Sequence, residues 1–320
     1  MKKYAFIILV IILSAVFFAA CAIGRDNSGS RQPAQQGKIT VAATIFPLYD
    51  FTRAVAGDKI ELIMLLKPGE EIHSYEPSPA DIIKVQNADM FFYIGGERDQ
   101  WVQRILGSMD NSGKTVLKFM DCVSLVEEET VEGMEEEEEE EEEETAFDEH
   151  IWTTPANCIL MIQAIAKTLA EADTANAAYY QDNADVYCAR FNDLDRQFKE
   201  VVAGGRHKLL VFGDRFPFRY FADVYGLEYR APFNGCSTST DASAGTLAYL
   251  MNVTQENNLP YIYYIELSNE NIARAICEQT GAGRLLFHSG QTVSREDFNA
   301  GITFADIMQN NVETLRKGLN

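Results

Sequence analysis

The chain has 320 residues, of which 47% are hydrophobic and 23% are charged, and its formal net charge at pH 7 is −21. This is the composition of a globular protein, so a wholly disordered chain is excluded, and the length is sufficient for two ordinary domains. The excess of acidic residues argues against nucleic acid as the main partner, because phosphate binding requires clustered Lys and Arg.

The first 37 residues have the pattern of an export signal followed by a tether. Lys2 and Lys3 precede an uncharged apolar run over residues 4–20, and small residues stand just before Cys21. This pattern resembles the lipobox of bacterial lipoproteins, so we predict a signal peptide over residues 1–20 and lipidation of Cys21. Residues 21–37 are rich in Gly, Ser and Gln and predict a flexible tether. The alternative is a retained transmembrane anchor; both interpretations place the rest of the chain outside the cytoplasm.

Residues 38–172 alternate between short apolar runs and helical patterns. Strands are predicted over residues 38–44, 60–66, 90–94 and 116–117, and helices over residues 50–55 and 101–106. Two further helices begin at Ser78-Pro79 and Thr154-Pro155, where a capping hydroxyl precedes a proline in the first turn. Alternation of this kind predicts an N-terminal α/β lobe with a parallel sheet.

Most of the negative charge lies in one segment of this lobe. Residues 127–144 contain fourteen Glu and no Lys or Arg, and subtracting these charges from −21 leaves −7. The unbroken Glu run over residues 135–144 has no apolar position with which to bury a face. We therefore expect a disordered acidic loop over residues 127–145. It would serve either as a solvated spacer or as a weak collector of cations.

A long helical pattern follows and separates the first lobe from a second. The predicted linking helix covers residues 173–205 and, at 1.5 Å per residue, would exceed the width of a small domain. Residues 206–320 again alternate, with strands over 208–212, 261–265 and 284–287 and helices over 218–225, 246–253, 268–280 and 304–319. The predicted fold class is α/β, with two α/β lobes of parallel sheets flanked by helices and joined by a long backbone helix.

Three of the four histidines stand where loops of open α/β sheets contact ligands. His73 lies in PGEEIHSYEPSP, His150 lies in DEHIWTTP, and His288 directly follows the predicted strand over residues 284–287. Three neutral imidazoles and one oxygen ligand would make a tetrahedral zinc site. Position alone, however, does not distinguish a ligand from a structural or exposed histidine.

Three segments of the chain resemble a known family. PGEEIHSYEPSPADIIKVQNADMFFYIGG is similar to the zinc- and manganese-binding proteins that serve ABC importers, in which the His of H-x-Y-E-P-x-P is a metal ligand. DEHIWTTPAN resembles the second ligand segment of that family, D-P-H-I-W-x-x-P, which an acidic or His-rich loop commonly precedes. ADTANAAYYQDNADVY resembles the start of its long helix. The resemblance covers nearly all of the chain after residue 37 and implies that His73 and His150 bind a metal ion in a cleft between the lobes.

The second lobe departs from the family pattern. Arg215 stands where many zinc-binding members have a His, and an Arg cannot ligate a cation. His288 stands where many members have a metal-binding Asp, so we expect His288 to compensate. The fourth ligand could be water, Asp214, Cys236 or Glu266. We select Glu266 as the expected fourth ligand. Asp214 and Glu266 could instead pair with Arg215 or cap a helix.

The resemblance implies a monomeric, lipid-anchored protein at the outer face of the cell membrane, which captures a transition metal ion and delivers it to an ABC-type permease. No enzymatic reaction is implied. Three imidazoles favour zinc over manganese, which prefers more carboxylate oxygen; manganese and iron remain alternatives. Two other interpretations are a surface adhesin with a structural metal site and a zinc hydrolase. The absence of an HExxH motif argues against the hydrolase.

Overall fold

The computed structural model describes residues 37–71, 75–96, 99–108, 113–135, 146–237, 239 and 241–320. The predicted signal peptide, Cys21, His73 and residues 136–145 of the acidic loop therefore lie outside the described residues. Residues Lys38–Asn320 form one compact unit. Within the described part of the chain, no helix has the length and apolarity needed to cross a membrane. We refer to residues 38–172 as the first lobe and to residues 206–320 as the second lobe.

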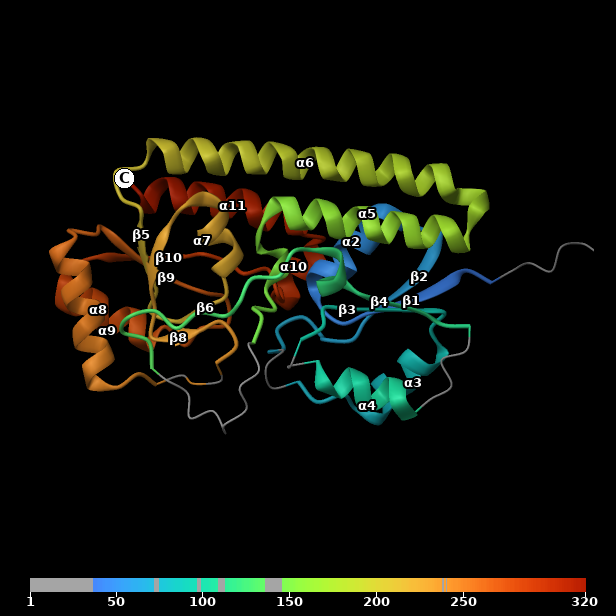
Figure 1. Ribbon diagram of the computed structural model, residues 1–320, viewed down its shortest axis with the longest axis horizontal. Helices are drawn as coiled ribbons and strands as arrows, with labels where there is room; N and C mark the ends of the chain where they lie inside the picture. The colour runs from blue at the N-terminus through green and yellow to red at the C-terminus, as the bar shows by residue number, and fades with distance from the viewer. Residues whose placement is uncertain are drawn as a thin grey trace, which may run out of the picture. The chain divides into compact units, whose positions relative to one another are not determined.

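The first lobe is built on a four-stranded parallel sheet in the order β2-β1-β3-β4. Its strands are β1 (Ile39–Ala43), β2 (Ile60–Met64), β3 (Met90–Tyr93) and β4 (Thr115–Lys118). Helices α2 (Phe46–Ala56) and α5 (Pro155–Ala172) cover one face, and α3 (Pro79–Asn87) and α4 (Gln100–Ser108) cover the other (Figure 1). Alternate residues of β3 confirm this arrangement, because Phe92 packs in the core with α2 and α5 whereas Phe91 packs with α3 and α4.

The second lobe contains short parallel strands in three pairs. β5 (Leu209–Val211) pairs with β7 (Glu228–Arg230), β6 (Arg215–Phe216) with β8 (Phe233–Asn234), and β9 (Tyr261–Tyr264) with β10 (Gly283–Leu286). A parallel bridge between Phe212 and Tyr263 connects the first and third pairs. Pro217 directly after β6 and Pro232 directly before β8 limit these strands, since proline cannot donate a ladder hydrogen bond. The helices of this lobe are α7 (Arg219–Tyr225), α8 (Ala244–Glu256), α9 (Asn271–Thr280), α10 (Arg295–Ala300) and α11 (Phe304–Gly318).

The long helix predicted between the lobes is α6 (Ala177–Gly204), whose 28 residues span about 42 Å. In Figure 1 it runs above both α5 and α11. Its buried face contacts both lobes, since Phe191 packs edge-on against Phe51 of α2 and Phe198 packs edge-on against Phe221 of α7. The predicted α/β fold with a long linking helix is therefore confirmed.

A buried carboxylate joins three of these helices. Asp50 of α2 accepts hydrogen bonds from the Tyr187 hydroxyl of α6 (2.5 Å) and from the backbone N–H of Phe304 at the start of α11 (2.9 Å). Arg53 Nη2 lies 2.5 Å from the other carboxylate oxygen. Burial raises the pKa of Asp50, although these donors oppose the shift. The carboxylate therefore serves as a common acceptor at the junction of α2, α6 and α11.

Replacing Asp50 with Ala should lower the free energy of unfolding by about 3 kcal/mol, because it leaves a buried hydroxyl and a buried N–H without an acceptor. Chemical denaturation monitored by circular dichroism measures this change. Asp193→Ala on α6 is the matched control, since it removes an exposed carboxylate that pairs with Arg196. Equal effects of the two substitutions would contradict the role assigned to Asp50.

The turn after β3 contains a second buried acid, Asp99, which accepts the backbone N–H of Gly95 at 2.9 Å. Burial raises the pKa of Asp99 to about 6 despite the backbone donors Gly95 and Ile94.

An acid with a raised folded-state pKa stabilises the fold below its unfolded pKa, and this contribution is lost as the pH rises through the folded value. The stability of Asp99→Asn relative to the parent should therefore rise between about pH 4 and pH 6 and then level off. Denaturation at several pH values measures the difference, and a constant difference across this window would refute the prediction.

Candidate metal centre

His150 lies in the interface between the two lobes and is 1% exposed. It directly precedes the short 3-10 helix η3 (Ile151–Thr153). Asp148 Oδ1 accepts the backbone N–H of His150 at 2.7 Å and lies 3.1 Å from the ring nitrogen Nδ1. On the other side is Gly235 of the second lobe, where a Cβ atom would lie 2.7 Å from Cε1 of the imidazole. The absence of a side chain at this glycine allows the second lobe to approach the His150 ring.

The ionisation of His150 depends on the acidic groups around it. Burial of the ring lowers its pKa, but the negative charges of Asp148, Glu149 and Glu128 and the hydrogen bond that the ring donates to Asp148 outweigh this effect, and the net direction is upward. The surroundings of His150 therefore favour positive charge, whether it is supplied by a proton or by a metal ion.

His288 and Glu266 lie together in the second lobe, at the carboxyl ends of β10 and β9. Nδ1 of His288 is 3.3 Å from Oε2 of Glu266 and also accepts the backbone N–H of Gly290 at 2.9 Å. Ser289 donates to the same carboxylate through its backbone N–H (2.8 Å) and through its hydroxyl. With bonds of about 2.0–2.1 Å, two ligands of a tetrahedral zinc ion stand about 3.3 Å apart. The Nδ1 to Oε2 distance therefore fits a pair of ligands to one ion.

One hydrogen bond connects the surroundings of His150 and His288. Trp152, whose ring centroid lies 5.4 Å from that of His150, donates from Nε1 to the backbone carbonyl of Ser289 at 3.0 Å. The structure thus brings Glu266 and His288 into contact and places His150 in the same interface. Within the described ranges, no three His, Cys, Asp or Glu side chains form a metal-binding group by themselves. The remaining predicted ligand, His73, is in the stretch 72–74, outside those ranges.

The chain leading to His73 is tied to the second lobe by an ion pair. Glu71 Oε2 lies 2.8 Å from Nη2 of Arg215, whose Nη1 donates to the backbone carbonyl of Ser237 at 3.2 Å. From the sequence, Asp214 and Glu266 were possible partners of Arg215, and the ion pair with Glu71 was not expected. Asp214 instead accepts the backbone N–H of Arg215 at 2.8 Å, and burial raises its pKa. Glu71 is 144 positions away in sequence, and no local pattern indicates this pairing.

Residues 127–135, the part of the predicted acidic loop that the structure describes, make defined contacts, whereas the sequence predicted disorder over residues 127–145. Glu127 and Phe147 form an antiparallel bridge, and the backbone N–H of Glu135 donates to the carbonyl of Pro232 at 2.9 Å. The Glu135 carboxylate accepts the backbone N–H of Ser243, the N-cap of α8, and this bond lowers the Glu135 pKa. The apolar residues Val131 and Met134 pack against the core and explain the difference, since the prediction considered mainly the charge.

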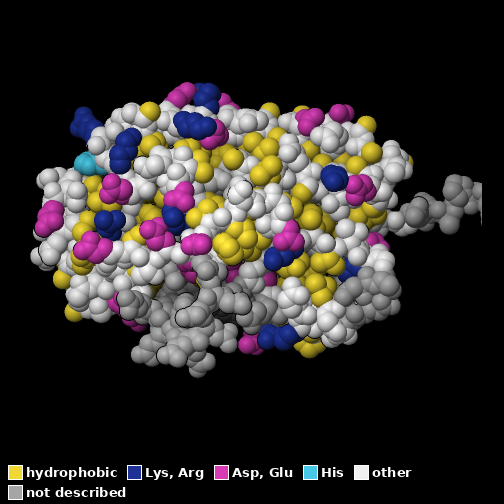
Figure 2. Space-filling model, in the orientation of Figure 1, with side chains coloured by type: hydrophobic (Ala, Val, Ile, Leu, Met, Phe, Trp, Pro, Cys, Tyr) yellow, Lys and Arg dark blue, Asp and Glu magenta, His cyan; other side chains and the backbone are white. Residues whose placement is uncertain are grey.

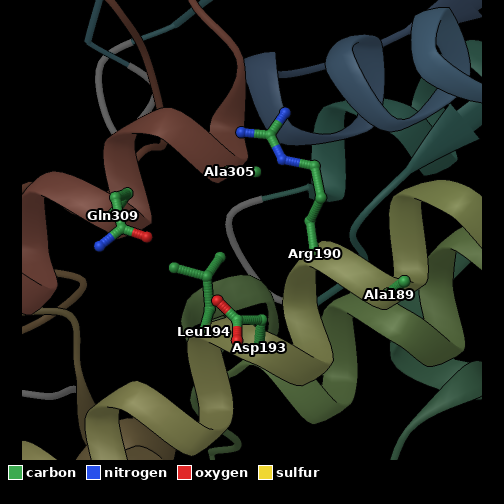
Figure 3. Close-up of a pocket in the computed structure, with 6 residues that line it drawn as sticks. All are labelled: Ala189, Arg190, Asp193, Leu194, Ala305 and Gln309. Carbon is green, nitrogen blue, oxygen red and sulfur yellow. The ribbon is translucent and has the colours of Figure 1, made fainter.

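The groove between α6 and α11 does not provide a metal site. It has a volume of about 330 Å³ and is lined by Ala189, Arg190, Asp193, Leu194, Ala305 and Gln309 (Figure 3). Its one acid, Asp193, pairs with Arg196, and its one base, Arg190, pairs with Asp306. On the face in Figure 2, basic and acidic side chains are interspersed among the described residues, which differs from the continuous basic surface that nucleic acid binding requires.

Comparisons with known proteins identify the family of the chain. A sequence model of the family described as "Zinc-uptake complex component A periplasmic" (ZnuA) matches residues 41–318. The high-affinity zinc uptake system protein ZnuA of Bacillus subtilis is 29% identical over 308 residues, which are 96% of each chain. The zinc-binding lipoprotein AdcA of Streptococcus pneumoniae is 29% identical over 318 residues, which are 99% of this chain but 61% of AdcA.

The structural comparison leads to the same family. The crystal structure of the Zn(II)-bound ZnuA-like domain of Streptococcus pneumoniae AdcA matches with a TM-score of 0.73 and 27% identity. The match covers 88% of this chain and 99% of that domain. Because the family model spans nearly all of the chain after residue 37, the protein belongs to the ZnuA family of zinc-uptake complex components.

Proposed function

We propose that this protein captures a zinc ion between its two lobes and delivers it to an ABC-type membrane permease. The proposed ligands are His73 and His150 of the first lobe and His288 of the second, with Glu266 as an oxygen ligand. The observation that carries this proposal is the 3.3 Å contact between His288 Nδ1 and Glu266 Oε2, in the same interface that holds His150.

The family assignment supports binding and delivery rather than catalysis, as predicted from the sequence. Zinc is the ion named for the relatives from Bacillus subtilis and Streptococcus pneumoniae. It also suits the proposed ligands, since three imidazoles favour zinc over manganese, which prefers more oxygen. Manganese is the alternative cargo.

The remaining proposals concern segments that the structure does not describe or does not test. We propose that residues 1–20 are a signal peptide, that a lipid on Cys21 anchors the protein to the outer face of the cell membrane, and that residues 21–37 are a tether. The proposed lobes cover residues 38–172 and 206–320, joined by the helix over residues 173–205, and the protein acts as a monomer. The name of AdcA as a lipoprotein and the description of the family as periplasmic support the placement outside the cytoplasm.

Replacing His73 or His150 with Ala should weaken zinc binding at least about tenfold, which corresponds to about 1.4 kcal/mol, because each loses one metal–nitrogen bond. Competition calorimetry with a chelator of known affinity measures the change. His207→Ala is the control, since this fourth histidine precedes β5 and is not part of the proposed site. Unchanged affinity in either site variant would remove that residue from the ligand set.

The second-lobe ligands are tested by His288→Ala and Glu266→Gln. Both should weaken zinc binding at least about tenfold, because the first removes a nitrogen ligand and the second replaces a charged ligand with a neutral amide that binds zinc poorly. Parallel manganese titrations should show a larger zinc-to-manganese preference for the parent than for His288→Ala. Unchanged zinc affinity in His288→Ala would refute the compensation by His288. Unchanged zinc affinity in Glu266→Gln would show that Glu266 is not a ligand and serves only as the hydrogen-bond partner of Ser289.

A further inference from the structure

We propose that Asp148 is a positioning residue that fixes the His150 imidazole with Nδ1 bonded to the protein and Nε2 directed to the ion, and that Tyr220 of the second lobe holds Asp148 in place. This inference rests on the proposed function, because it assumes that His150 binds the ion. It adds a chain of contacts in which the second lobe positions a ligand of the first.

The contact between Asp148 and His150 determines which ring nitrogen carries the proton. A carboxylate can only accept hydrogen bonds, so the 3.1 Å contact of Asp148 Oδ1 with Nδ1 requires a proton on Nδ1. In neutral imidazole the lone pair that can bind a metal is then on Nε2. The two side chains are 1% and 2% exposed, so bulk water does not compete for this contact. The same oxygen also accepts the backbone N–H of His150 at 2.7 Å, which limits rotation of the carboxylate.

The surrounding groups hold the ring in this orientation. Gly235 of the second lobe leaves no room for a Cβ atom, which would lie 2.9 Å from Nδ1, and the Trp152 ring lies at 60° to the imidazole. The imidazole is therefore packed between a glycine of one lobe and a tryptophan of the other. A flip of the ring about the Cβ–Cγ bond would put Cδ2 in the place of Nδ1 and break the contact with Asp148, and it would have to displace these neighbours.

Tyr220 connects Asp148 to the second lobe. Its hydroxyl, on helix α7, donates to the backbone carbonyl of Asp148 at 2.9 Å and accepts the backbone N–H of Val126 at 3.3 Å. The backbone N–H of Asp148 in turn donates to the carbonyl of Val126 at 3.0 Å. The hydroxyl of one second-lobe residue thus bridges the two chain segments that flank the acidic loop. A shift of α7 relative to the first lobe would be transmitted to Asp148 and from there to His150.

The expected effects follow from the role of hydrogen-bonded partners of metal ligands. Removing the acceptor of a metal-binding histidine typically weakens metal affinity by about 10- to 100-fold, and we expect this loss of zinc affinity for Asp148→Ala. Asp148→Asn keeps an oxygen acceptor without the charge and should recover most of the affinity. Tyr220→Phe, which removes one hydrogen bond from the connection, should weaken zinc binding about three- to tenfold.

Tyr225→Phe is the matched control. Tyr225 also lies on α7 and its buried hydroxyl also donates to an acceptor, Asp195 Oδ1 at 3.0 Å, but Asp195 belongs to α6 and does not touch His150. The substitution makes the same chemical change on the same helix. Zinc affinity should remain as in the parent, whereas Tyr220→Phe should lower it.

A second measurement separates positioning from a general structural effect. Two-bond ¹H–¹⁵N correlation spectra of the metal-free protein distinguish protonated from unprotonated ring nitrogens, and His150→Gln assigns the signal. We expect the parent and Asp148→Asn to have protonated Nδ1, and Asp148→Ala to have both tautomers. If Asp148→Ala does not fold, the zinc affinity of Tyr220→Phe and the spectrum of the parent still test the positioning role of Asp148.

The outcomes distinguish this inference from the proposed function. If His150→Ala binds zinc as tightly as the parent, the ligand assignment of His150 is wrong. If His150→Ala loses affinity while Asp148→Ala and Tyr220→Phe do not, or if the parent carries the proton on Nε2, the positioning role is overturned and the zinc-binding function stands.

Discussion

The structure depends on polar contacts that connect the loops of one lobe to those of the other. Parallel strands place their carboxyl ends at one edge of a sheet, and the loops at this edge are where open α/β folds bind ligands. In this protein the loops after β9 and β10 supply Glu266 and His288, and the loop after β2 leads to His73. The ion pair of Glu71 with Arg215 holds the loop after β2 against the second lobe, and the hydrogen bond of Trp152 with Ser289 holds the loop after β10 against the first lobe.

Further hydrogen bonds orient the side chains of the proposed ligands. His150 is held by Asp148, Glu266 receives two hydrogen bonds from Ser289, and Nδ1 of His288 receives the N–H of Gly290. Groups that are already ordered lose less conformational entropy on binding, which favours affinity. The contact of Gly290 with Nδ1 also implies that an ion bound through this nitrogen would have to displace that N–H. Binding at His288 would therefore rearrange the hydrogen bonds after β10, whereas binding at His150 through Nε2 would preserve those of Asp148.

The sequence was sufficient to predict the elements that depend on local patterns. A long helical pattern predicted α6, and the Ser78-Pro79 start of α3 is present as a full capping box with Asp81. Periodicity and family resemblance together also predicted the two lobes. The three short strand pairs of the second lobe were not predicted as such, because strand pairing depends on contacts between distant residues rather than on local propensity.

The contacts that organise the candidate site were the hardest to predict. Nothing near Arg215 in the sequence indicates that Glu71 is its partner, and nothing near Asp148 indicates that Tyr220 bonds to its carbonyl. The order of residues 127–135 of the predicted acidic loop was missed because a few apolar side chains, Val131 and Met134 among them, outweigh the charge of their neighbours. Motifs and strand ends led to His150, His288 and Glu266 as candidate ligands, but only the fold shows which side chains hold them.

The most direct test of the account is anomalous diffraction at the zinc absorption edge from crystals of the zinc-loaded protein. The account predicts one strong peak between the lobes, about 2.0–2.1 Å from nitrogen atoms of His73, His150 and His288. A peak that contacts residues of only one lobe, or that lies along the Glu run with no imidazole nearby, would contradict it.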